Sequence, residues 1–209
     1  MSADKPGLFI TLEGGEGVGK STAAAALAAL LREEGHKVTL TREPGGTAGA
    51  EAIRQLLLQQ SLPLVPMAQT MLHFAARIDH VERCIRPALM RGDIVICDRF
   101  YDSTLAYQAH GQGVAQADVE ALIGLVRLTP DLTFLLDLPE EQALQRLKAR
   151  AGGTDRYEDM GQAFFARVRA GFDAIATAAP MRFVRVDASP SPQDVAARLR
   201  EIISERTKW

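Results

Sequence analysis

The chain has 209 residues, of which 47% are hydrophobic and 24% charged. This is typical of one soluble globular domain with a sizeable core, and we expect a single domain over 1–209. The formal net charge of -2 argues against general nucleic-acid binding, so any basic site must be local. The two cysteines form no Cys-x-x-Cys pair, which argues against zinc. Low cysteine use and no recognisable signal peptide predict a cytoplasmic protein that does not bind membranes.

Short apolar segments alternate with longer amphipathic or Ala/Leu-rich segments along the whole chain. The apolar segments predict strands at 8–13, 37–41, 93–97, 133–138 and 182–186. The segments between them predict helices at 20–34, 48–60, 68–90, 103–109, 117–127, 140–151, 162–178 and 193–205. We expect Pro87 to kink the long helix near its end. This alternation predicts an α/β fold, with a parallel sheet of about five strands covered by helices on both faces.

The segment G-G-E-G-V-G-K-S, residues 14–21, matches the P-loop pattern between a predicted strand and a predicted helix. Glycines and the helix N-terminus present backbone N–H groups to phosphate. Lys20 is expected to reach the β- and γ-phosphates of ATP, and the Ser21 hydroxyl to bind Mg²⁺. The predicted nucleotide-binding residues are Gly14, Gly15, Glu16, Gly17, Val18, Gly19, Lys20, Ser21 and Thr22. The chain contains no asparagine, so it lacks the Asn-Lys-x-Asp guanine-reading segment of GTPase switches.

Three further segments indicate the acceptor side of the reaction. T-R-E-P-G-G-T at 41–47 and D-R-F-Y-D-S-T-L-A-Y-Q at 98–108 each follow a predicted strand, where open α/β sheets bind ligands. H-F-A-A-R at 73–77 lies between them. In this order, and over nearly the whole chain, these segments resemble the thymidylate kinases. The resemblance implies a P-loop kinase fold with a lid loop, and transfer of the ATP γ-phosphate to dTMP with Mg²⁺.

The resemblance also implies roles for individual residues. Phe74 and Arg77 share a helix face, and their expected roles are to stack on the thymine and to bond its carbonyl. Thr104 and Gln108, with Ser103 close by, suit the edge of the base, since hydroxyl and amide groups match its donors and acceptors. The family places Tyr107 beneath the sugar.

Charged residues complete the expected acceptor site. Arg54 and Arg99 are expected to grip the acceptor phosphate, because guanidinium groups suit phosphate oxygens. Asp98 is expected either to hold Mg²⁺ through water or to orient the acceptor phosphate. Glu43 is expected to bind the sugar 3′-hydroxyl or a metal-bound water. We expect His36, His80 and His110 to lie at the surface, because they show no ligand spacing.

Glu16 places a negative charge inside a loop that binds phosphate, so it needs a cationic partner. Arg150 and Arg156 flank the segment A-G-G-T-D, within a stretch at about 149–160 that corresponds to the family's lid over ATP. We expect this chain to resemble the bacterial members that use lid arginines. Our hypothesis is that Arg156 reaches the γ-phosphate and is steadied by Glu16. Arg150 is the alternative, and the sequence alone does not decide between them.

Two other functions stay open at this point. One is a kinase for another pyrimidine monophosphate; the other is a P-loop regulator that binds ATP without transferring phosphate. The resemblance suggests a homodimer. The apolar helices at 68–90 and 117–127 could form its interface, or equally could be internal core.

Overall fold

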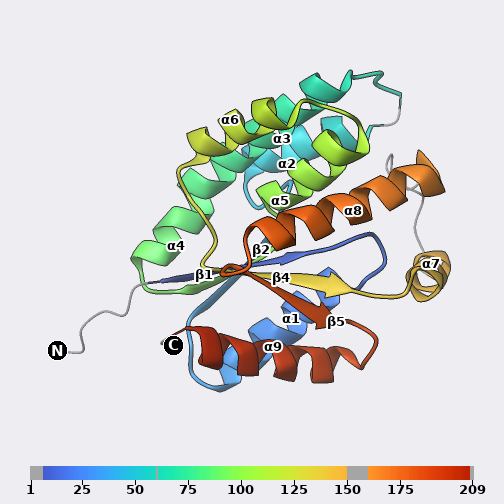
Figure 1. Cartoon of the computed structure of the whole chain (residues 1–209). Helices are drawn as coiled ribbons and strands as arrows, with labels where there is room; N and C mark the ends of the chain where they lie inside the picture. Colours follow the sequence, from blue (N-terminus) through green and yellow to red (C-terminus); the bar gives the residue numbers. More distant parts are fainter. Residues whose placement is uncertain (1–6, 60, 150–159, 208–209) are drawn as a thin grey trace.

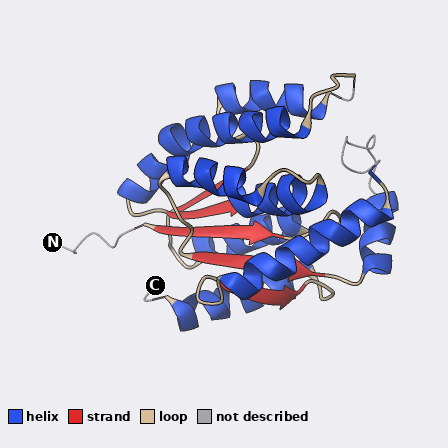
Figure 2. Cartoon of the chain, turned by 45° about the horizontal axis from the view of Figure 1, so that its top comes forward, coloured by secondary structure: helices blue, strands red, loops and turns tan. Residues whose placement is uncertain are grey.

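Five parallel strands form one sheet within the part of the chain that the computed structural model describes, which is residues 7–59, 61–149 and 160–207. The strand order is β2-β3-β1-β4-β5, and Figure 2 shows the sheet between its helices. The strands are β1 (Leu8–Glu13), β2 (Val38–Arg42), β3 (Ile94–Asp98), β4 (Leu132–Asp137) and β5 (Phe183–Asp187). The predicted strands are confirmed, each boundary lying within one residue of its expected place.

Helices cover both faces of the sheet, as predicted (Figure 1). The helices are α1 (Lys20–Glu33), α2 (Ala48–Leu58), α3 (Pro66–His80), α4 (Arg86–Met90), α5 (Tyr101–Thr104), α6 (Gln116–Val126), α7 (Glu140–Ala149), α8 (Gln162–Ala178) and α9 (Pro192–Arg206). Helices α1 and α9 pack on one face, against alternate strand residues such as Ile10 and Phe134. On the other face, Phe9 and Val95 pack against α3 to α6, while Leu135 contacts α8. The alternation of strand residues between two cores explains why the strands are apolar throughout.

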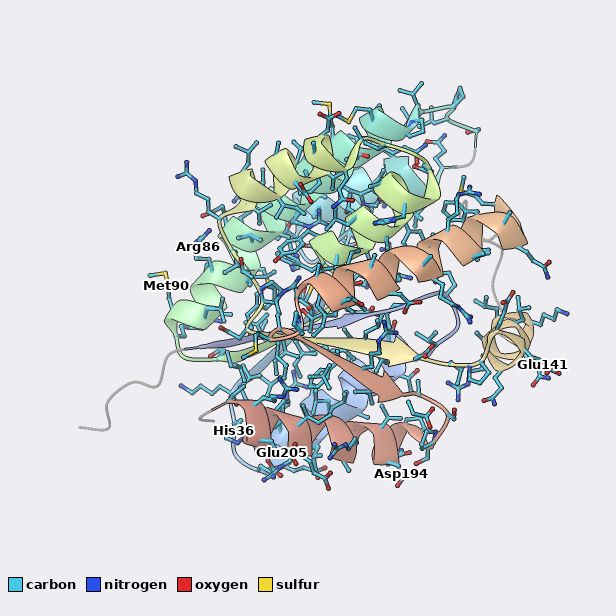
Figure 3. The ribbon with its side chains drawn as sticks, viewed as in Figure 1. His36, Arg86, Met90, Glu141, Asp194 and Glu205 are labelled. Carbon is cyan, nitrogen blue, oxygen red and sulfur yellow. The ribbon has the colours of Figure 1, made fainter. Side chains whose placement is uncertain are left out.

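The predicted helix at 68–90 is interrupted rather than simply kinked. A π-helical turn, Val81–Ile85, separates α3 from α4, and the Arg86 N–H bonds to the carbonyl of Val81, five residues earlier. Pro87 has no N–H to offer the preceding turn, which favours a local change in hydrogen-bond spacing. Similarly, the predicted helix at 103–109 begins as α5 and continues as a π-helical segment, Leu105–Gly111. Figure 3 shows Met90 projecting at the end of α4.

The carboxyl ends of β1, β2 and β3 lie level at one edge of the sheet. Leu12 and Arg42 both lie opposite Asp98 in the parallel register. The backbone N–H of Glu43 then bonds to the carbonyl of Asp98 at 2.9 Å, and that of Arg99 to the carbonyl of Leu12 at 2.9 Å. The three segments that follow these strands are therefore neighbours, although they lie far apart in the sequence.

None of the helices in the described residues combines the length and the apolar character needed to cross a membrane.

Candidate active site

A cavity of about 530 Å³ opens at this edge of the sheet. Its walls come from the P-loop, the loop after β2, α2, α3, the segment after β3, and α7. Most residues predicted for the site lie on these walls: Glu16, Gly17, Gly19, Lys20, Ser21, Thr22, Glu43, Arg54, Arg77, Asp98, Arg99, Ser103, Thr104, Tyr107 and Gln108. One enclosure thus contains both the expected phosphate cradle and most of the expected acceptor residues.

The P-loop connects β1 to α1, and its glycines allow a tight path. Gly17 has φ of +75°, and a Cβ there would come within 2.4 Å of the Ala143 carbonyl oxygen of α7, so only glycine fits without displacing that helix. The Lys20 ammonium donates to the carbonyls of Gly14 at 3.1 Å and Gly15 at 2.6 Å. Val18, by contrast, packs into the core beneath the loop. Burial and the charge of Arg99 lower the pKa of Lys20 to about 8, despite nearby carboxylates.

Ser21 and Asp98 meet beside the cradle. The Ser21 hydroxyl donates to Oδ2 of Asp98. The other carboxylate oxygen, Oδ1, is buried and has no hydrogen-bond partner among the described residues. A buried carboxylate oxygen without a donor is costly, and it marks a place for a cation or a water. A hydroxyl and a carboxylate oxygen side by side are ligands that Mg²⁺ accepts.

Glu16 pairs with Arg99 in the described structure. The Arg99 Nη2 donates to Oε1 of Glu16 at 2.5 Å, and the Tyr107 hydroxyl donates to the same oxygen at 2.9 Å. Arg99 also donates to the carbonyl of Gly14 at 3.2 Å and to the Ser103 hydroxyl at 3.0 Å. The P-loop carboxylate is thereby neutralised by an arginine from the acceptor side.

The partners that the sequence suggested for Glu16, Arg150 and Arg156, lie outside the described residues. Their contact with Glu16 therefore stays a prediction.

A buried ionic network supports the wall beneath α3. The Arg77 Nε donates to Oε2 of Glu43 at 2.6 Å, and Nη2 donates to the Thr104 hydroxyl at 3.2 Å. The other oxygen of Glu43 lies 3.0 Å from Nδ1 of His80. His80 is completely buried, so its predicted surface position was wrong, whereas His36 lies at the surface (Figure 3). The Glu43 carboxylate is therefore buried between the Arg77 guanidinium and the His80 imidazole rather than exposed to solvent.

Phe74 requires a correction, because its ring does not line the cavity. It is 2% exposed and packs in the core with Phe100, while the guanidinium of Arg77 lies 4.7 Å from its ring centre. The neighbouring His73 lines the cavity instead. Adjacent helix residues point about 100° apart, so only one of the two can face the cavity. The more apolar ring entered the core.

Glu13 and Arg146 are site residues that the sequence interpretation missed. Glu13 accepts from the Phe100 N–H at 2.8 Å and from the Ser103 hydroxyl at 2.6 Å, and so fixes the start of α5 next to Arg99. Burial and the charge of Asp102 raise the pKa of Glu13 to about 7. The sequence feature that could have identified Glu13 is its position as a carboxylate at the end of an otherwise largely apolar strand. Arg146, on α7, lines the cavity beside the P-loop.

The fold and this two-sided cavity together define a P-loop nucleotide kinase. The thymidylate kinase family model matches residues 12–199. A relative from Gluconobacter oxydans (strain 621H), named thymidylate kinase, is 58% identical over 203 residues, covering 95% of each chain. A Synechococcus relative of the same name is 49% identical, covering 95% of each. The solved thymidylate kinase from Ehrlichia chaffeensis aligns with a TM-score of 0.77 and 34% identity, covering 95% of this chain and 99% of that one. The chain belongs to the thymidylate kinase family.

Proposed function

We propose that this protein transfers the γ-phosphate of ATP to dTMP, giving dTDP and ADP as a step in making DNA precursors. The observation that carries the proposal is the single cavity in which a P-loop faces a second, arginine-rich wall with amide and hydroxyl groups. A protein that only bound ATP would not need this second wall. The family membership supports dTMP over the other pyrimidine monophosphates.

On the donor side, Lys20 and the P-loop N–H groups bind the ATP phosphates. Ser21 and Asp98 fit Mg²⁺, since the hydroxyl contacts Asp98 and the buried Oδ1 of that carboxylate has no other partner in the described chain. When bound, the ion neutralises charge on the phosphates. The carboxylate of Asp98 also lies where it can help to orient the acceptor phosphate.

On the acceptor side, Arg77 bonds a thymine carbonyl. Its Nη1 is buried and makes no hydrogen bond to the described residues, which suits a donor kept for a ligand. Thr104 and Gln108 lie on the same wall. His73 takes the stacking role that the sequence suggested for Phe74. Its imidazole is neutral at physiological pH, because burial and the charges of nearby arginines lower its pKa to about 3.

The sugar and the acceptor phosphate occupy the middle of the cavity. Tyr107 lies beneath the sugar, where its ring, packed edge-on against Phe164 and Phe172, restricts space at the 2′ position. Arg54 and Arg99 grip the acceptor phosphate. Glu43 acts through Arg77, since its carboxylate oxygens are engaged by Arg77 and His80. Arg150 and Arg156 remain our candidates for closing over ATP.

The test is ADP release from Mg–ATP with a panel of acceptors: dTMP, dUMP, UMP, dCMP, CMP, AMP and GMP. Strong preference for dTMP is the expected result. Preference for another pyrimidine monophosphate would retain the phosphate chemistry and overturn the assignments at the base. Tight ATP binding without turnover on any acceptor would favour the regulator instead.

We also propose that the protein acts in the cytoplasm as a homodimer. Met67, Met71 and Ile78 lie on one side of α3 and are 37%, 58% and 40% exposed, and their spacing places them on one helix face. Leu125 on the adjacent α6 is 61% exposed. A second copy would cover these side chains. Light scattering should give twice the monomer mass, and Met71→Glu should lower it.

A further inference from the structure

His80 is a buried imidazole whose two ring nitrogens are both engaged by one remote segment. Nδ1 lies 3.0 Å from Oε1 of Glu43, and Nε2 lies 2.7 Å from the Thr41 hydroxyl. Both partners belong to the end of β2 and the loop that follows it. Burying a polar ring completely is costly unless its nitrogens are satisfied, so His80 and this segment depend on each other.

The loop after β2 is folded around the ring. Gly46 has φ of +87°, and a Cβ there would lie 2.4 Å from Nε2 of His80, so the loop approaches the imidazole as closely as glycine permits. The next residue of the loop, Thr47, donates to Asp79 at 2.5 Å. Arg54 donates to the carbonyl of Pro44, in the same loop, at 2.8 Å. His80 and Asp79 at the end of α3, together with Arg54 of α2, therefore hold this loop in place.

The effect of His80 reaches the cavity through Glu43. That carboxylate is shared: Oε1 contacts His80 and Oε2 accepts from the Arg77 Nε. Thr104 accepts from Nη2 of Arg77. Two of the three guanidinium nitrogens are thus fixed, and the third, Nη1, has no partner among the residues described. Any rotation of Glu43 would move that free donor.

We propose that His80 is a positioning residue for the acceptor base: it holds Glu43 in the orientation that directs Arg77 at the pyrimidine. This inference rests on the proposed dTMP kinase function. Burial alone would lower the pKa of His80, but the neighbouring Cys84 of the π-helical turn and the Glu43 carboxylate outweigh it and raise that pKa to about 9, so the imidazolium form is favoured. A protonated ring donates to Glu43 and gives the buried carboxylate a second positive neighbour beside Arg77.

The test compares His80→Gln and His80→Asn. An asparagine amide can take the place of Nδ1 and still donate to Glu43, whereas a glutamine amide reaches the position of Nε2 and leaves Glu43 without this donor. We expect His80→Gln to raise the KM for dTMP about tenfold or more, the range for losing a hydrogen bond to a charged group. The KM for ATP should stay within about twofold, and His80→Asn should restore most of the dTMP affinity.

Thr41→Val is the matched control, because it removes the other hydrogen bond to the same ring. It should lower the melting temperature without changing the KM for dTMP. In a Glu43→Gln background, His80→Gln should have no further effect on that KM, since His80 acts through Glu43.

A wild-type enzyme with no dTMP-dependent turnover would refute the proposed function itself. Normal wild-type turnover with an equal KM for dTMP in His80→Gln, His80→Asn and Thr41→Val would refute the positioning role alone. If His80→Gln does not fold, the single variants His80→Asn and Glu43→Gln still test the positioning role. The expected pattern is a loss of dTMP affinity in Glu43→Gln but not in His80→Asn. Equal loss in both would overturn the inference.

Discussion

Glu16→Gln tests directly what the P-loop carboxylate does. The substitution keeps the size of the side chain and removes its charge from the Arg99 guanidinium, 2.5 Å away. The two side chains are only 18% and 17% exposed, so solvent screens the pair weakly. A hydrogen bond between charged groups contributes about 1.5–3 kcal/mol. Because Arg99 keeps its contacts to Gly14 and Ser103, we expect Glu16→Gln to lower the free energy of unfolding by an amount near the middle of that range, about 2 kcal/mol.

A double-mutant cycle separates this pair from the alternative lid partner. Urea unfolding of the ligand-free enzyme should give a coupling energy of about 1–3 kcal/mol between Glu16→Gln and Arg99→Met. The same cycle with Arg156→Ala should be additive within about 0.5 kcal/mol. Additivity between Glu16→Gln and Arg99→Met would refute the pairing of Glu16 with Arg99. Coupling between Glu16 and Arg156 in kcat would then support the lid partner.

Three further predictions concern stability. Protonated His80 stabilises the fold because its folded pKa is about 9 and its unfolded pKa about 6.5, and this contribution is fully present below about pH 6.5. The difference in unfolding free energy between wild type and His80→Phe should therefore fall by about 3 kcal/mol as the pH rises from about 6.5 through 9. A constant difference in urea unfolding from about pH 6 to 10 would contradict this. Gly46→Ala should lower the free energy of unfolding by more than about 2 kcal/mol, because the new Cβ would clash with His80 and alanine would also be strained at the positive φ of this position. Gly35→Ala, at φ of +89° in open space, should cost only about 1 kcal/mol, and equal costs would refute the clash. Arg182→Met should lower the free energy of unfolding by about 3–5 kcal/mol, measured by heat or urea. It leaves the fully buried Asp102 carboxylate without the two hydrogen bonds from Arg182, at 2.7 and 2.9 Å. A decrease below about 1 kcal/mol would contradict this.

The sheet and the P-loop could be predicted because their signals are local. A buried parallel strand is a short apolar run between turn residues, and this pattern placed every strand within one residue. The P-loop glycines, Lys20 and Ser21 follow one another in the chain. The cavity could be predicted in outline because parallel strands end at the same edge, which brings Glu43 and Asp98 together.

Pairings across long stretches of chain could not be predicted in the same way. Glu16 needed a cation, and the sequence suggested only the lid arginines, whereas the structure pairs Glu16 with Arg99, 83 residues away. No local sequence pattern marked His80 as buried, because its partner Glu43 lies 37 residues away in the loop after β2. Whether His73 or Phe74 faces the cavity depends on how α3 is rotated about its axis. Tertiary packing sets that rotation, so it could not be predicted from the two residues themselves.

The position of Arg99 has a consequence for how two substrates share one enzyme. Its guanidinium touches the P-loop at Glu16 and Gly14, and the acceptor side at Ser103 and Tyr107. A nucleotide that draws Arg99 toward its phosphate must first separate it from Glu16. Because Arg99 is assigned to the acceptor phosphate, we expect bound dTMP to release Glu16 from Arg99 and so to change the P-loop to which ATP binds. Since linkage between two sites is reciprocal, ATP should favour dTMP binding by the same factor by which dTMP favours ATP.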